Sequence, residues 1–268
     1  PLGFASIDST RPHSRSFEPK FILPHYMTAN LLRYLLGSLV MVLLLEAISP
    51  AVSVHAQQVA SSNPGTFTLG RLKYEGGGDW YSDPLSLREL IQFVQANTRL
   101  PIADQEVIVD LDQDRLFAFP VVYLTGHGNV RFSPSHVRRL RAYLEQGGFL
   151  HIDDNYGLDE HIRREMRKVY PNQEFVELPF SHPIYHSHFS FPEGLPKVHE
   201  HDGNPPQGFG LFNSAGELVV FYSYESDLGD GWEPREVHDN PDAVREAALK
   251  MGTNILVYAF MRPKDANS

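Results

Sequence analysis

One histidine stands where many enzymes carry a nucleophile. The triplet Gly126-His127-Gly128 directly follows the apolar run 120–125 and precedes an expected helix. In a strand–turn–helix elbow the central residue is normally Ser or Cys, and the flanking glycines permit the sharp turn. An imidazole at this position can serve as a general base, a metal ligand or a ligand-binding donor. It can equally be a structural histidine bonded to the loop backbone.

Two further polar clusters follow expected strands in the same way. They are Gly76-Gly77-Gly78-Asp79-Trp80 and Asp153-Asp154-Asn155. Ligands of parallel sheets bind beyond the carboxyl ends of the strands, so we expect the three clusters to share one edge. One of the two adjacent acids is expected to cap the helix that follows. The catalytic candidates are His127, Asp153 and Asp154, and the ligand-binding candidates here are Gly77, Gly78, Asp79, Trp80, Gly126, Gly128 and Asn155.

A third region, residues 179–207, is rich in His, Pro and Gly and is expected to form long loops. Imidazole together with carboxylate suits zinc or another divalent metal. The candidate metal ligands are His127, Asp153, His182 and His186, and Tyr185 is an aromatic ligand-binding candidate. No complete signature such as H-E-x-x-H occurs. The loop histidines, which also include His188, His199 and His201, are therefore either ligands or ordinary exposed residues.

The elements that must position these residues alternate between strands and helices. Strands are expected over 66–74, 106–111, 120–125, 149–152 and 175–178, and a hairpin over 208–213 and 217–224. Helices are expected to begin at Asp83-Pro84, Ser133-Pro134, Leu158 and Asn240-Pro241, the last of them running to about Met261. This order predicts an α/β fold with a mostly parallel sheet covered by helices.

The N-terminal part has the pattern of a secretory signal peptide. Arg33 precedes the apolar run 34–45, and Val54-His55-Ala56 provides a cleavage site before Gln57. The alternative is a retained membrane anchor, but Glu46 and Pro50 leave the apolar run shorter than a span requires. We therefore expect Met27 to be the true start and the product to be exported, periplasmic or extracellular. The expected parts are 1–56 (extension and signal), 57–65 (linker), 66–262 (α/β domain) and 263–268 (tail).

Composition narrows the possible functions. The chain has 268 residues, no cysteine and a formal net charge of −10. The missing cysteine excludes disulfides, thiolate metal sites and a cysteine nucleophile within this chain. The negative charge disfavours a broad nucleic-acid surface, so nucleic acid is not an expected partner.

The strings GGGDWYSDP, LTGHG, YLEQGGFLHIDD and LPFSHPIYH occur in this order. Their combination resembles the bacterial domain of unknown function 4159 over roughly residues 67–261. The resemblance implies a class I glutamine amidotransferase-like fold, which is a flavodoxin-like three-layer sandwich with helices on both faces. Where amidotransferases carry the nucleophilic Cys, this chain has His127, so a Cys–His–Glu triad is not available. The resemblance implies a fold and not an activity.

Two functions remain open from the sequence. The first is a ligand-binding or scaffolding domain of the bacterial cell envelope, whose partner is a small molecule or an envelope protein. It would contact the membrane only through an uncleaved signal segment. The alternative is a metal-dependent hydrolase, in which His127, Asp153 or Asp154 and a histidine of the 182–188 loop hold a divalent metal that activates water.

Overall fold

The computed structural model describes residues 65–262, which all belong to one compact unit, Val59–Ser268. The predicted signal peptide, the linker up to residue 64 and the tail 263–268 lie outside the described residues. Within the described part, no helix combines the length and the apolar character that a membrane span requires.

A seven-stranded sheet forms the centre of the domain, in the order β2-β1-β3-β4-β7-β6-β5. The neighbouring strands β2, β1, β3, β4 and β7 are parallel. At the edge beyond β7, β6 pairs antiparallel with β7, and β5 pairs antiparallel with β6. The strands are β1 (Leu69–Lys73), β2 (Val107–Asp110), β3 (Val121–Leu124), β4 (Phe149–Asp153), β5 (Val176–Glu177), β6 (Gln207–Phe212) and β7 (Leu218–Tyr224). The prediction of an α/β fold with a mostly parallel sheet is confirmed.

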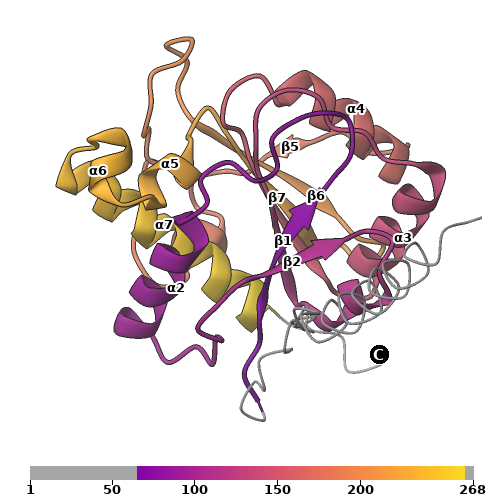
Figure 1. Ribbon diagram of the computed structural model, residues 1–268, viewed down its shortest axis with the longest axis horizontal. Helices are drawn as coiled ribbons and strands as arrows, with labels where there is room; N and C mark the ends of the chain where they lie inside the picture. The colour runs from indigo at the N-terminus through magenta and orange to yellow at the C-terminus, as the bar shows by residue number, and fades with distance from the viewer. Residues whose placement is uncertain (1–64, 263–268) are drawn as a thin grey trace, which may run out of the picture. The chain divides into compact units, whose positions relative to one another are not determined.

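Helices pack on both faces of this sheet (Figure 1). Side chains of β3 alternate between the two cores: Val121 and Tyr123 lie in one, Val122 and Leu124 in the other. The first core is completed by α2 (Ser86–Asn97), α5 (Leu228–Trp232) and α7 (Asp242–Met261). The second core is completed by α3 (Pro134–Glu145) and α4 (Asp159–Val169). Short helical turns η1 (Asp114–Ala118), η2 (Pro183–Tyr185) and α6 (Arg235–His238) complete the structure.

Most helix boundaries agree with the sequence signals. Ser133 caps α3 by accepting a hydrogen bond from the His136 backbone N–H, and Pro134 occupies the first helical position. The predicted start of a helix at Asp83-Pro84 is wrong, because α2 begins at Ser86. Asp83 has the left-handed φ of 51°, and its carbonyl accepts from Ser86 and from Arg71. Asp83 thus closes a turn before the helix.

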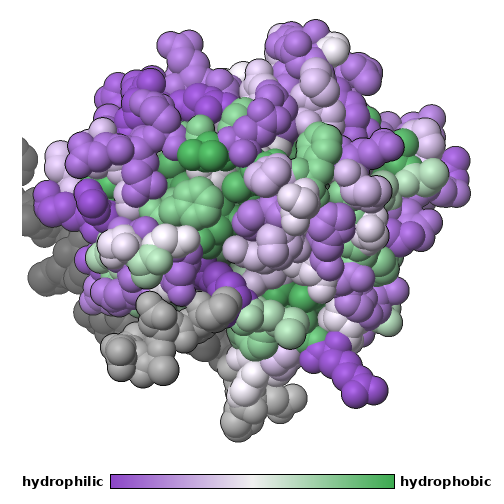
Figure 2. Space-filling model, turned by 180° about the vertical axis from the view of Figure 1, so that it is seen from behind, coloured by the Kyte–Doolittle hydropathy of each residue, from purple (hydrophilic) through white to green (hydrophobic). Residues whose placement is uncertain are grey.

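Arg262, directly after α7, binds backbone carbonyls at the amino ends of β7 and β4. The guanidinium of Arg262 is 8% exposed and donates to the carbonyls of Leu218 at 2.6 Å, Gly148 at 2.9 Å and Gly147. These carbonyls stand at the starts of β7 and β4. Seen from the side opposite to Figure 1, the surface is predominantly polar, with apolar areas interspersed among polar side chains (Figure 2).

Candidate functional site

The carboxyl ends of β1, β3, β4 and β7 meet at one edge of the sheet, because these strands are parallel neighbours. The segments that follow them contain Asp79, His127 and Asp154, and Asp153 is the last residue of β4, so these residues lie at one edge as predicted. The segment after β7 adds residues 225–230, which the sequence did not assign to this edge. Polar groups that end or follow four strands therefore lie at the place where open α/β sheets bind ligands.

Asp79 and His127 form the outer pair of this edge. One carboxylate oxygen of Asp79 accepts the His127 backbone N–H, and the other lies 3.1 Å from ring Nδ1. The side chains are 34% and 53% exposed, respectively. Asp79 thus fixes the direction of an imidazole that remains open to solvent.

Glycines allow the two loops to approach each other this closely. A Cβ on Gly126 would lie 2.9 Å from the Asp79 carbonyl oxygen, and one on Gly78 would lie 2.7 Å from the His127 carbonyl oxygen. Gly77 and Gly128 have positive φ with open space around them, so they serve the turns and not the contact. Trp80 is half-buried against the core that includes α3 and α4, with Lys73 Nζ 5.9 Å from its ring.

A basic depression of about 670 Å³ is lined in part by the loop that follows β3, and neither Asp79 nor His127 lines it. Asn129, two residues after His127, lines it together with Arg131 and with Arg164 and Lys168 of α4. Glu165, which is buried, binds Lys168 and Arg164, so one carboxylate offsets part of the positive charge. Donors and positive charge at this depression suit an anionic group.

Asp153 lies in the interior beneath the edge. It is 0% exposed and accepts four hydrogen bonds, from the hydroxyls of Tyr123 and Ser223 and from the backbone N–H groups of Leu228 and Gly229. Burial and the charge of Asp227 raise its pKa to about 7, against these hydrogen bonds. Both carboxylate oxygens are occupied in holding the start of α5.

Asp154 is the acid that serves the following helix. Its carboxylate accepts the backbone N–H of Leu158 at 3.1 Å, just before α4, and the hydroxyl of Tyr222 at 3.1 Å. Burial raises its pKa to about 6. The expectation that one of the two acids is the N-cap of the next helix is wrong, because Leu158 occupies that position without a side-chain cap bond; Asp154 instead binds the backbone N–H of Leu158.

Asn155 is fully buried and joins the loops after β3 and β1. Its amide oxygen accepts from Thr125 Oγ1 at 2.8 Å, and its amide nitrogen donates to the Asp83 carboxylate. Burial, followed by the hydrogen bond with Asp230, raises the pKa of Asp83. Asn155 therefore links the buried Asp83 carboxyl to the sheet edge.

The remaining predicted ligands make their contacts elsewhere. His182 Nδ1 accepts the Ile184 backbone N–H, and its ring lies 5.4 Å from Tyr258 of α7. His186 Nε2 lies 2.8 Å from the Phe180 carbonyl oxygen. Tyr185 is fully buried in the core. These residues bond within their own loop and against α7, and no contact joins them to His127.

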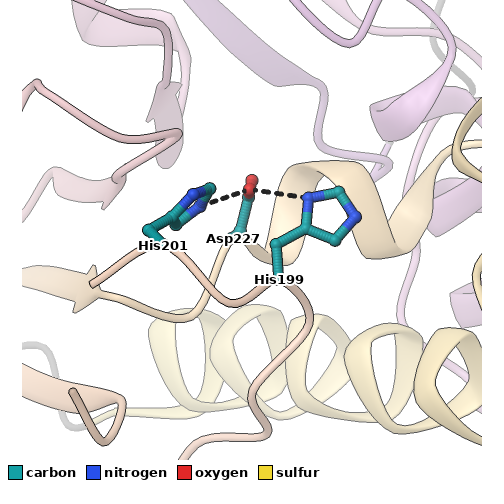
Figure 3. Close-up of side chains that lie close together, drawn as sticks. All are labelled: His199, His201 and Asp227. Carbon is teal, nitrogen blue, oxygen red and sulfur yellow. Dashed lines mark hydrogen bonds and ion pairs between the residues drawn. The ribbon is translucent and has the colours of Figure 1, made fainter. Parts of the chain in front are cut away.

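A second polar cluster involves residues that the sequence did not bring together (Figure 3). His199 Nδ1 lies 3.2 Å and His201 Nε2 lies 3.0 Å from the same oxygen of Asp227, which follows β7. Hydrogen bonds to Asp227 and Asp230 raise the pKa of His199 to about 10. Burial alone would raise the pKa of Asp230. The hydrogen bond from His199 acts against burial, and the pKa of Asp230 is lowered. The sequence signal was only the His199-x-His201 spacing.

Three sets of side chains in the described part of the chain have ligand atoms within 4.8 Å of one another. They are His199, His201 and Asp227; His199, Asp230 and His238; and Asp110, Asp112 and His136. None of these sets contains His127, Asp153, His182 or His186.

Fold and edge together define an α/β domain whose mostly parallel sheet presents polar loops at its carboxyl end. The chain belongs to the DUF4159 family, described as a domain of unknown function, whose sequence model matches residues 68–260. No curated protein matches the chain.

Proposed function

We propose that this chain is an exported, non-catalytic ligand-binding domain of the bacterial cell envelope, and that its ligand carries an anionic group. The observation that carries the proposal is the basic depression lined by Asn129 and Arg131, which belong to the same loop as the exposed His127 of the Asp79–His127 pair. Export rests on the sequence pattern of residues 27–56. The helices on both faces of the sheet support the flavodoxin-like, amidotransferase-like class that the sequence motifs imply.

The dimensions and charge of the depression favour a small molecule. Its volume of about 670 Å³ lies within the range of small-molecule sites. Arg131, Arg164 and Lys168 place positive charge there, of which Glu165 offsets part, on a chain whose net charge is −10. A carboxylate or phosphate group would find charge-assisted hydrogen bonds at this place and repulsion over most of the remaining surface.

The hydrolase alternative, as built on His127, Asp153 and the 182–188 loop, has less support. Asp153 is buried under four hydrogen-bond donors. His182 and His186 contact α7 and their own loop. A metal ion held by these residues would require three separate rearrangements.

The binding proposal is tested by titrating citrate and inorganic phosphate into the purified chain and following heat or thermal shift. Arg131→Ala should weaken binding of the better anion by about tenfold, since a charge-assisted hydrogen bond contributes about 1.5–3 kcal/mol. His127→Ala should weaken it by a smaller factor, because His127 lies in the same loop but does not line the depression. Arg88→Ala is the matched control, because Arg88 is an exposed arginine on α2. Equal affinity in all four proteins, or no binding of either anion, would remove the proposed site.

Export has its own test. Sequencing the N-terminus of the protein recovered from outside the cytoplasm should give Gln57 as the first residue. An intact N-terminus in the membrane fraction would instead identify a retained anchor.

A further inference from the structure

The cluster around Asp227 has the donor set and spacing of a metal centre. His199 Nδ1 and His201 Nε2 lie 3.2 and 3.0 Å from Asp227 Oδ2. A tetrahedral ion with bonds near 2.0–2.1 Å separates its ligand atoms by about 3.3 Å. The two rings approach the carboxylate from either side (Figure 3), and the ligand atoms of the three residues all lie within 4.8 Å of one another.

The carboxylate of Asp227 has bonding capacity that the protein leaves unused. Asp227 is 1% exposed, and its second oxygen, Oδ1, is buried without any hydrogen-bond partner. A buried carboxylate oxygen without a partner costs free energy that a protein rarely leaves uncompensated. A cation bound by Asp227 would provide that compensation.

The surroundings of His199 fix its ring as a metal ligand requires. Its Nε2 lies 3.2 Å from the side-chain oxygen of Asn240, which can only accept a hydrogen bond there. Nε2 therefore carries a proton, and Nδ1 is directed at the acidic groups. Histidines that bind metals are commonly oriented by such a bond from their other ring nitrogen.

Negative charge in this cluster is balanced mainly by histidine. Asp83, Asp227 and Asp230 lie together, and Gly229 lets the chain approach Asp83 because a Cβ there would lie 2.8 Å from its carboxylate. The nearby Lys197 is paired with Glu225 at 2.7 Å. Among the ion pairs of the described residues, none joins a Lys or Arg to these three aspartates.

We propose that His199, His201 and Asp227 bind a divalent transition-metal ion, with zinc as the first candidate. Two imidazoles and one carboxylate suit zinc and its neighbours and do not suit the all-oxygen preference of magnesium or calcium. Three protein ligands leave a fourth position for water or a bound molecule. His199 and His201 are 28% and 18% exposed, so this position can be reached from solvent. The inference goes beyond the anion-binding proposal and does not depend on it.

The experiment uses the purified full chain, stripped with a chelator and dialysed. Zinc is titrated in competition with a chromogenic chelator, and cobalt(II) is added separately to record its visible absorption. Wild type should bind one zinc ion per chain and give the intense cobalt bands of a four-coordinate site. Asn240→Ala, which removes the partner that orients His199, should lower zinc affinity by about 10–100-fold. His201→Gln and Asp227→Asn, which each remove a direct ligand, should lower it by more.

Matched controls separate this site from its neighbours. His238→Gln and His136→Gln each remove one imidazole from another possible set, and both should leave zinc affinity within about twofold of wild type. Circular dichroism and thermal melting of each metal-free variant verify folding. If Asp227→Asn fails to fold, His201→Gln carries the test, because His201 lies on a partly exposed loop.

Three results would overturn the proposal. No zinc binding by wild type would leave the cluster as a network of charged hydrogen bonds. Loss of zinc in His238→Gln but not in His201→Gln would place the ion in the set of His199, Asp230 and His238. Equal binding by all variants would place it outside the described cluster. Anion binding by Arg131→Ala is measured separately, so failure of one proposal is distinguishable from failure of the other.

Discussion

Asp79 binds His127 twice, through the backbone N–H and through ring Nδ1, across 48 residues of sequence. The loop after β1 therefore sets both the position and the direction of the imidazole after β3. Neither contact involves a regular element, so the pair depends on the two glycine-rich loops alone.

Asp79→Ala should cost about 1 kcal/mol of stability, because it removes a charge-assisted bond to a backbone N–H. His127→Ala should cost less than about 0.5 kcal/mol, since the ion pair it removes is largely exposed. Urea denaturation of the two variants beside wild type measures the difference. A larger loss for His127→Ala would mean that the ring, and not the carboxylate, holds the loops together.

Gly126→Ala should be far more damaging than Gly128→Ala. Gly126 has φ of +131°, and its Cβ would lie 2.9 Å from the Asp79 carbonyl oxygen and also meet the Tyr74 hydroxyl. We expect a loss of about 3 kcal/mol or more. Gly128 has φ of +74° with no atom within 4 Å, so the cost there should be about 1 kcal/mol. Thermal unfolding of both alanine variants separates the stability cost of a steric clash at Gly126 from the cost of an unfavourable φ alone at Gly128.

Asp154 should make the domain less stable as pH rises. Burial raises its folded pKa from 3.8 to about 6, so between these values the folded state binds more protons than the unfolded state. The contribution is fully present below about pH 4 and is lost as pH rises through 6, amounting to up to about 3 kcal/mol. Asp154→Asn, which can retain the bond from Leu158, should flatten this part of the profile. Chemical denaturation between pH 4 and 8 tests it, and a wild-type stability that rises over this range while the variant's does not would contradict the assignment.

Asp153→Ala should cost about 3 kcal/mol and loosen α5, because it leaves the N–H groups of Leu228 and Gly229 without a partner in the interior. Ser223→Ala removes one of the four donors and should cost about 1 kcal/mol. Hydrogen exchange over residues 228–232 should increase strongly in the first variant and little in the second. Unchanged exchange in Asp153→Ala would show that α5 is held by its apolar contacts.

The main strands and helices could be predicted because their signals are local. Alternating apolar residues marked β1, two apolar runs around a short turn marked the hairpin of β6 and β7, and a capping Ser followed by Pro marked α3. Leu228–Trp232, with the sequence LGDGW, was missed because two glycines in five residues oppose any helix prediction. Missing α5 also hid the role of Asp153, a catalytic and metal-ligand candidate whose carboxylate instead binds the start of that helix.

The histidine–aspartate cluster could not be predicted for a topological reason. β7 pairs with β6 as a hairpin, and that much is visible in the sequence, but its other edge pairs with β4, 70 residues earlier, at Leu150 and Val220. Only this pairing brings Asp227 to the edge where β1, β3 and β4 end. His199 and His201 could not be placed at this edge from the sequence either, because they reach Asp227 from a loop without regular structure.

The contacts of Arg262 determine when the domain can complete its folding. Its guanidinium binds a carbonyl 114 residues earlier in the chain. At a synthesis rate of about 5–20 residues per second, that carbonyl waits on the order of 10 s for its partner. Contacts of such long range also slow folding after synthesis is complete. If the chain is exported, as proposed, the delay leaves the polypeptide open during the interval in which a translocation machinery must thread it. The contacts of Arg262, directly after α7, would then form only after the chain has crossed the membrane.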